Sequence, residues 1–194
     1  MANINQEDVK SVTIDVKDVE GAAGYKVEIP AEALSSEVYG KNIIVKTSIA
    51  TIILPENMLA NMKQEHEYIE LTVVYPDIQA LSKDVREAIG SDYAIEVNIA
   101  AAGEKIMWKN PQASVEIQVD CNPEKFDVNN AEYFSVWFID SAGNRKPVVN
   151  ARYSMDTEKM IFNTNHFSIY SISAEKKTFS DLDNYEWARK EIEV

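Results

Sequence analysis

The strongest constraint on the fold is a series of short segments in which apolar and polar residues alternate. A period of two places every second side chain on one face of a strand, so each segment predicts a strand with one buried face. Turn residues at Asp140–Asn144 and Asp156–Lys159 predict two hairpins. The predicted strands cover Val12–Val16, Tyr25–Ile29, Ile43–Lys46, Thr51–Leu54, Ile69–Val74, Ala94–Ile99, Val115–Val119, Phe134–Ile139, Met160–Phe162 and Phe167–Ile172.

Three of these strands end in a proline that is followed by helix-favouring residues. The units read VEIPAEAL (27–34), IILPENML (52–59) and VVYPDIQAL (73–81). Proline ends a strand and suits the first turn of a helix, where its missing N–H is not needed. The third unit continues into a longer helical stretch, for which Gly90 is the predicted C-cap. We expect a recurring strand-to-helix corner and not a solenoid, because the spacings differ.

These patterns predict a mainly β (α+β) fold class. A chain of 194 residues is long enough for one large or two small domains with a real core. We expect residues 1–107 to form a β-rich, sandwich-like subdomain with short helices after the strand–proline corners. Residues 108–176 contain no helical signal and are expected to form an Ig-like antiparallel β-sandwich, with residues 177–194 as a third segment.

The net charge of −13, from 32 acidic and 19 basic side chains, argues against two classes of partner. Nucleic acids are bound by Lys and Arg side chains that displace counterions from phosphates, and anionic membrane surfaces attract the same side chains. No apolar run approaches the roughly 18 residues that span a bilayer. We therefore expect no nucleic-acid partner and no membrane insertion.

Few residues suggest metal, cofactor or nucleophilic chemistry. Cys121 is the only cysteine, which excludes an internal disulfide, and no flanking pattern pairs it with His166 as nucleophile and base. His66 and His166 have no Cys or His partner at ligand spacing. No cofactor and no metal site are expected, with weak surface calcium sites on the acidic surface as an open alternative.

Residues 177–194 carry a more specific pattern, KTFSDLDNYEWARKEIEV. It resembles the opening of an S-layer homology module, a family that tethers bacterial exoproteins to cell-wall polymers. The resemblance implies a truncated start of such a module and an extracellular location at the cell wall (S-layer) of a Gram-positive-type bacterium. Without the family, the segment predicts an amphipathic helix that packs on its own domain. The matching residues are Phe179, Asp181, Trp187, Ala188 and Ile192.

The body of the chain carries a second resemblance. Strand–proline–helix units followed by hairpins and a closing T-N-H-F-S-x-Y strand (164–170) resemble the region that precedes S-layer homology modules in clostridial-type surface proteins. More distantly, the I-P-A-E-A-L corner and the H-F-S strand resemble the β-sandwich domain of ankyrins and netrin receptors. The first resemblance implies a location and carries no activity.

The tripeptide His166-Phe167-Ser168 is the one motif that suggests a reaction. Relatives of the ankyrin and netrin-receptor domain, and the nucleoporin autoproteolytic domain, cut themselves between Phe and Ser of such a motif. That resemblance implies attack of the Ser168 hydroxyl on the Phe167 carbonyl, assisted by His166. The alternative is a structural strand in which Phe167 faces the core, and this alternative is the prediction.

Aromatic residues raise the possibility of a sugar-binding surface. Trp108 lies in a junction, and Tyr133 and Trp137 fall on the same face of a predicted strand. Exposed rings would stack on sugar rings, whereas Trp in a central strand is more often part of the core.

Together these features predict a non-catalytic extracellular spacer or interaction module of a cell-wall-anchored bacterial surface protein. Its expected contact with cell-wall polymer runs only through the remainder of the S-layer homology region. A polysaccharide or a surface protein is a further possible partner. The rival functions are a carbohydrate-binding module that uses Trp108, Tyr133 and Trp137, and a self-cleaving domain that uses His166 and Ser168.

Overall fold

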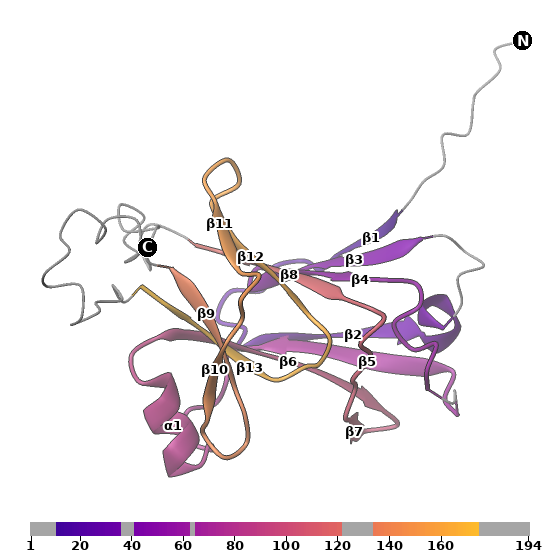
Figure 1. Cartoon of the computed structure of the whole chain (residues 1–194). Coiled ribbons are helices and arrows are strands. Elements are labelled where there is room, and N and C mark those ends of the chain that lie inside the picture. Colours follow the sequence, from indigo (N-terminus) through magenta and orange to yellow (C-terminus); the bar gives the residue numbers. More distant parts are fainter. Residues whose placement is uncertain (1–10, 36–40, 63–64, 122–133, 175–194) are drawn as a thin grey trace, which may run out of the picture.

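The computed structural model describes residues 11–35, 41–62, 65–121 and 134–174. These residues form two β-sheets that face each other (Figure 1). The six-stranded sheet contains β1 (Ser11–Asp15), β3 (Asn42–Lys46), β4 (Ala50–Leu54), β8 (Val115–Asp120), β11 (Arg152–Ser154) and β12 (Lys159–Thr164). The seven-stranded sheet contains β2 (Gly24–Pro30), β5 (Tyr68–Val74), β6 (Tyr93–Ala101), β7 (Glu104–Ile106), β9 (Ser135–Ile139), β10 (Arg145–Pro147) and β13 (Ile169–Ser173).

The predicted mainly β, sandwich-like fold is confirmed. Alternation in the sequence becomes alternation in burial: β8 places Val115, Ile117 and Val119 in the core, and the residues between them are only partly covered. Each predicted strand lies on an observed one. Beyond the ten predicted strands, the structure shows β10 and β11, which complete the two predicted hairpins, and β7, whose three residues are too few for a periodic pattern to be recognised.

The strand order joins the two halves of the chain in both sheets. The six-stranded sheet runs β1-β3-β4-β8-β12-β11, and the seven-stranded sheet runs β10-β9-β13-β6-β5-β2, with β7 beside β6. The boundary expected between residues 107 and 108 does not lie between the two sheets. It falls inside both of them, since β4 pairs with β8 and β6 pairs with β13. Alternation shows that a strand has a buried face, but it does not show which strand is its partner.

Two of the three proline corners lead into a helix, and one does not. After Pro30 the chain forms a short 3₁₀ helix, Ala31–Leu34, and after the third corner it forms α1 (Lys83–Ile89). Ser82 caps α1 at its start, and Gly90 ends it with a φ of 59°, as predicted. The second corner, after Pro55, forms successive turns and no helix. Neither described helix is long and apolar enough to span a membrane.

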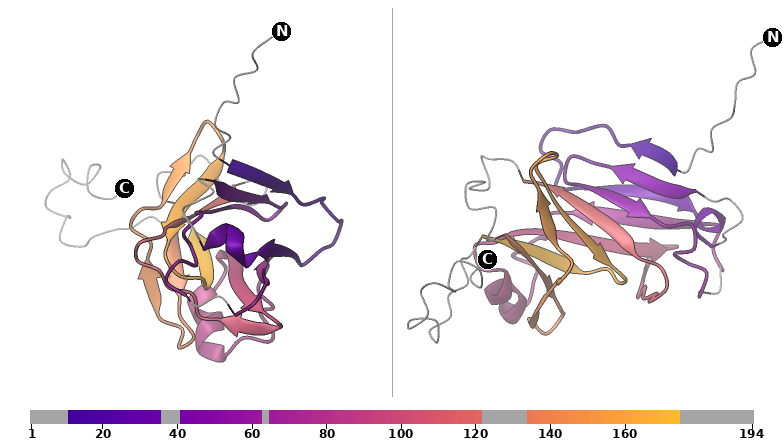
Figure 2. Two further views of the ribbon diagram at one scale, coloured as in Figure 1. Left: turned by 90° about the vertical axis from the view of Figure 1, so that its right-hand side faces the viewer. Right: turned by 45° about the horizontal axis from the view of Figure 1, so that its top comes forward.

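β1 and β13 are the first and the last strand of the described chain. β1 pairs parallel with β3, and β13 lies between β9 and β6 with antiparallel neighbours. The start of β1 and the end of β13 lie at opposite ends of the sandwich in Figure 1 and in the right-hand view of Figure 2. The described part of the chain thus begins at one end of the sandwich and finishes at the other.

Because both sheets contain strands from both halves, we expect the protein to unfold in one cooperative transition. Val119 of β8 is fully buried and pairs with Ala50 of β4 and Met160 of β12. Val119→Ala should lower the free energy of unfolding by about 2 kcal/mol and shift the whole transition, since it leaves a cavity at the junction. Urea unfolding followed by circular dichroism and tryptophan fluorescence measures both quantities.

The matched control is Val149→Ala, because Val149 is 92% exposed and its truncation should change stability by less than about 0.5 kcal/mol. Two separate transitions, of which only one responds to Val119→Ala, would contradict the shared core.

Candidate functional site

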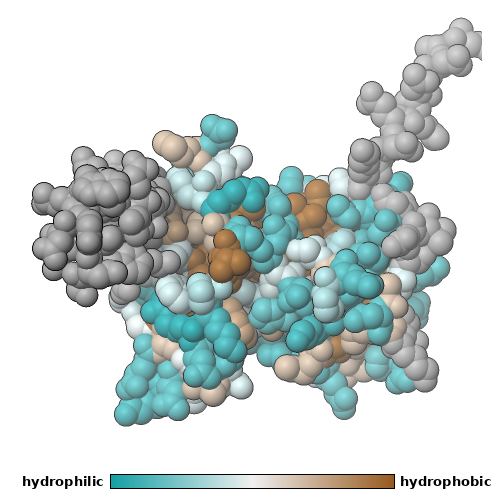
Figure 3. Space-filling model, viewed as in Figure 1, coloured by the Kyte–Doolittle hydropathy of each residue, from teal (hydrophilic) through white to brown (hydrophobic). Residues whose placement is uncertain are grey.

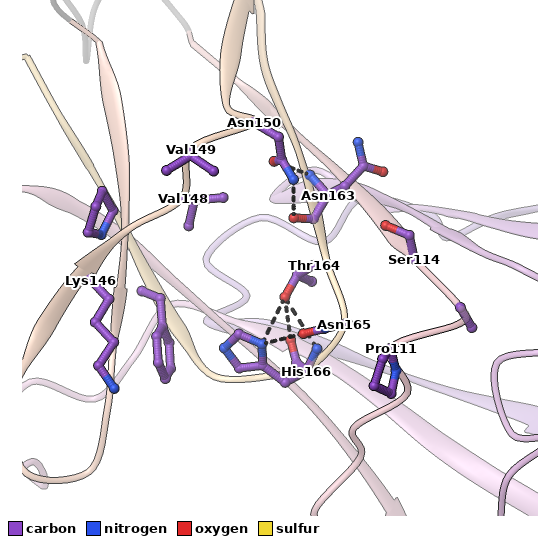
Figure 4. Close-up of a pocket in the computed structure, with 13 residues that line it drawn as sticks. Pro111, Ser114, Lys146, Val148, Val149, Asn150, Asn163, Thr164, Asn165 and His166 are labelled. Atoms are coloured by element: carbon purple, nitrogen blue, oxygen red, sulfur yellow. Dashed lines mark hydrogen bonds between the residues drawn. The ribbon is translucent and has the colours of Figure 1, made fainter.

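A cavity of about 450 Å³ opens where the segment after β10 passes the end of β12 (Figure 4). We call it the Asn163 cavity. Three stretches of chain line it: residues 111–114 before β8, residues 146–150 and residues 163–166, with Phe138 of β9 adding an aromatic wall. The T-N-H part of the closing motif therefore forms one side of this cavity.

Thr164 is the hydrogen-bond centre of that side. Its buried hydroxyl lies 2.8 Å from the carbonyl oxygen of His166 and 2.8 Å from the hydroxyl of Tyr170. The Tyr170 hydroxyl in turn donates to the same His166 carbonyl at 2.6 Å. Three groups from one short stretch of sequence thus close the turn between β12 and β13 and fix the position of His166.

His166 is held on the wall of the cavity by ring contacts. Its imidazole meets the ring of Phe138 edge-on, with 4.4 Å between the ring centroids. Its Nδ1 lies 3.1 Å from the Asn165 side-chain oxygen and 3.3 Å from the Thr164 hydroxyl. Burial lowers the pKa of His166, and the positive charges of Lys109 and Lys146 lower it further.

The other two members of the H-F-S tripeptide also have structural contacts. The ring of Phe167 packs on Trp108, with 4.8 Å between centroids. The Ser168 hydroxyl donates to the carbonyl of Ile139 at 2.9 Å, and the Ser168 carbonyl accepts from Val97 N–H at 3.0 Å. The Ser168 proton therefore points to a backbone carbonyl, whereas the nearest partners of the His166 ring nitrogen are Asn165 and Thr164.

The aromatic residues suggested as sugar contacts do not form an open row. Trp108 is 3% exposed, and its indole N–H donates to the Met58 carbonyl at 2.8 Å, so its ring belongs to the core. Trp137 is partly exposed, but the Arg145 guanidinium lies over its ring, 4.8 Å from the centroid. Tyr133 lies outside the described residues.

The residues that carry the S-layer homology resemblance also lie outside the described residues; these are Phe179, Asp181, Trp187, Ala188 and Ile192. Cys121 is buried, and burial raises the pKa of its thiol to about 11. Among residues 11–35, 41–62, 65–121 and 134–174, no three His, Cys, Asp or Glu side chains gather as metal ligands would.

Sequence reasoning found His166 but missed the rest of the cavity lining. Asn150 shows why: its side-chain amide donates to the Asn163 carbonyl at 3.1 Å and accepts from the Asn163 N–H at 3.0 Å. This pair of bonds attaches the segment after β10 to β12 and shapes the cavity. No periodic pattern or motif in the sequence signals such a contact between an asparagine in a loop and an asparagine near the end of a strand.

Comparison with known proteins finds a distant similarity to an enzyme. No protein-family model matches the chain, so the resemblance to S-layer homology proteins stays a prediction. The chain is 24% identical over 193 residues to an amylopullulanase from Thermoanaerobacterium thermosulfurigenes. The match covers 98% of this chain and 10% of that enzyme, so the chain spans about one tenth of the length of the relative.

The lowered pKa of His166 predicts a pH dependence of stability. The unfolded chain binds a proton at this histidine more readily than the folded one, so the free energy of unfolding should fall as the pH drops through about 6.5. His166→Asn should remove this component, and His66→Asn, which changes an exposed histidine, should keep it. Urea unfolding above and below this pH measures the difference; equal pH dependence in wild type and His166→Asn would refute the prediction.

We further predict that the peptide bond between Phe167 and Ser168 stays intact. The Ser168 hydroxyl donates to the Ile139 carbonyl, and the Ser168 carbonyl accepts a hydrogen bond from the Val97 N–H of β6. Mass spectrometry under denaturing conditions should show one full-length species for wild type and for Ser168→Ala. A fragment that begins at Ser168, formed by wild type and absent from Ser168→Ala, would instead establish self-cleavage.

Proposed function

We propose that this chain is a non-catalytic spacer or interaction module of an extracellular bacterial surface protein. The observation that carries the proposal is the position of the two ends: the start of β1 and the end of β13 lie at opposite ends of the sandwich (Figure 1). Segments joined to these two strands are therefore held apart by the long dimension of a folded body. A spacer requires this arrangement.

The pairing of the two terminal strands favours the same role. A force that separates the chain ends pulls β1 along β3 and pulls β13 along both β6 and β9. β1 is registered with β3 over five residue pairs, Ser11 to Asp15, and β13 is registered with β9 over five pairs. Sliding a strand along its neighbour strains the bonds of the ladder together, whereas peeling would break them one after another. The hydrogen bonds of β1 and β13 would therefore resist a force that pulls the two chain ends apart.

The distant relative supports a modular origin. In the amylopullulanase the similar region is one tenth of the chain, a share that suits one module among several. The H-F-S side chains serve the β12–β13 turn and the core, which favours a non-catalytic role for this region. The proposed wall attachment runs through the S-layer homology region that residues 177–194 are proposed to begin.

The surface suits a module surrounded by water and neighbouring modules. The net charge is −13, which keeps a protein soluble through mutual repulsion. On the face shown in Figure 3, hydrophobic residues form separate spots within a largely hydrophilic surface. A broad apolar docking area would mark a permanent protein interface, so this face supports contacts of a weaker, polar kind.

A second candidate function, glucan binding, is favoured by two observations. An amylopullulanase is named for starch-type glucan and pullulan, and the similarity covers nearly the whole of the present chain. The Asn163 cavity offers both apolar and amide groups on the protein surface. Binding of such a glucan would hold the parent protein on its polymer and is compatible with a spacer role.

The spacer proposal predicts mechanical resistance when the chain is pulled from its two ends. Single-molecule force spectroscopy with handles before residue 11 and after residue 174 should give a distinct force peak before the chain lengthens. A protein that extends smoothly, with no peak, would contradict the proposal.

A matched pair of proline variants isolates the contribution of β1. Val16 N–H donates to the Lys46 carbonyl of β3 at 2.8 Å. Because successive N–H groups of a strand point to opposite sides, the Val12 N–H also points toward β3 and the Thr13 N–H points away from it. Val12→Pro should lower the force at which β1 detaches, because proline has no N–H. Thr13→Pro should leave that force nearly unchanged. Both side chains are exposed, so the two variants lose little packing.

A further inference from the structure

The Asn163 cavity has the size and accessibility of a ligand site. Its volume of about 450 Å³ falls within the range of roughly 300–1,000 Å³ that small-molecule sites occupy. Figure 4 shows His166 and Pro111 on one side and Lys146 with Val148 and Val149 on the other. The two sides come from distant parts of the sequence.

The lining of this cavity contains both polar and apolar groups. The side chains of Ser114 and Asn163 line it and make no hydrogen bond within the part of the chain that the structure describes. A hydroxyl and an amide can each both donate and accept, which matches the hydroxyl groups of a sugar. Val148 and Pro111 supply apolar surface for the C–H faces of a sugar ring.

The charge of the lining favours a neutral ligand. No carboxylate is among the described residues that line the cavity, and Lys146 is the one side chain there with a full charge. The Lys146 ammonium lies 3.8 Å from Asp140, which offsets part of its field. The protein as a whole carries a net charge of −13 and repels a polyanion at a distance. A neutral polyhydroxyl compound meets none of these penalties.

The walls are also held in place before any ligand arrives. Thr164 and Tyr170 fix the His166 side, because both hydroxyl groups donate to the His166 carbonyl. Asn150 fixes the opposite side through its two bonds to the backbone of Asn163. Walls that are already ordered lose little conformational entropy when a ligand binds. This organisation leaves the Asn163 amide itself available.

We propose that the Asn163 cavity is a binding site for a neutral α-linked glucan, in which Asn163 and Ser114 hydrogen-bond sugar hydroxyls and Val148 with Pro111 covers an apolar sugar face. This inference rests on the second candidate function, glucan binding, and identifies the residues that would perform it. The Phe138 ring contacts His166, with 4.4 Å between ring centroids, and Lys146, whose ammonium lies 5.8 Å from its centroid, and so supports these two lining residues.

Titration of the full chain with maltotriose, followed by amide chemical shifts in NMR spectra, tests the site directly. Shift changes should concentrate at residues 111–114, 146–150 and 163–166. The double variant Ser114→Ala/Asn163→Ala should weaken binding about tenfold or more, because two hydrogen bonds are lost. The control Ser91→Ala/Asn42→Ala removes one exposed hydroxyl and one exposed amide outside the cavity, and it should bind as wild type does.

The outcomes separate the site from the function. Maltotriose binding that the cavity variant leaves unchanged, with shifts elsewhere, would overturn the assignment of the site and leave glucan binding in place. No binding of maltotriose or pullulan by wild type would overturn both, and the spacer proposal would stand on its force measurement. Tighter binding of a trisaccharide of uronic acids than of maltotriose would overturn the neutral class of ligand.

Discussion

The structure depends on two strand pairings that join distant parts of the chain. β4 pairs with β8 and β6 pairs with β13, so each sheet is complete only when residues from before and after position 108 have met. A single cluster of buried residues, from Tyr25 to Ile172, fills the space between the sheets. Contacts of such long sequence separation carry a large loop-closure cost, which the shared core must offset. The start of β1 and the end of β13 lie at opposite ends of the resulting sandwich (Figure 1).

The turn between β12 and β13 connects this framework to the Asn163 cavity. Thr164 and Tyr170 belong to strands of opposite sheets, and their hydroxyl groups meet at the carbonyl of His166. The turn therefore links the two layers and sets the position of one cavity wall. The T-N-H-F-S-x-Y motif (164–170) thus forms the crossing between the two sheets.

The sequence predicted local features well and distant ones poorly. Alternation identified the strands, Gly90 identified the end of α1, and Asp140–Asn144 identified a hairpin, since each of these depends on neighbouring residues. Trp108 shows the limit: its place in a junction left an exposed, sugar-binding ring open as an alternative, but its N–H reaches the Met58 carbonyl, fifty positions away, inside the core. The Asn163 cavity was missed for the same reason, because Asn150 and Asn163 meet only after the sheets have assembled.

The edges of the two sheets bear on how such a module behaves beside others. A free edge strand invites pairing with another chain, and prolines, charges and short strands prevent it. In the seven-stranded sheet the edge strands β2 and β10 each end in proline, at Pro30 and Pro147. In the six-stranded sheet the edge strand β11 has only three residues, and β1 carries the exposed carboxylate of Asp15. Such edges suit the proposed spacer role, because a spacer that paired with its neighbours would lose its independent extension.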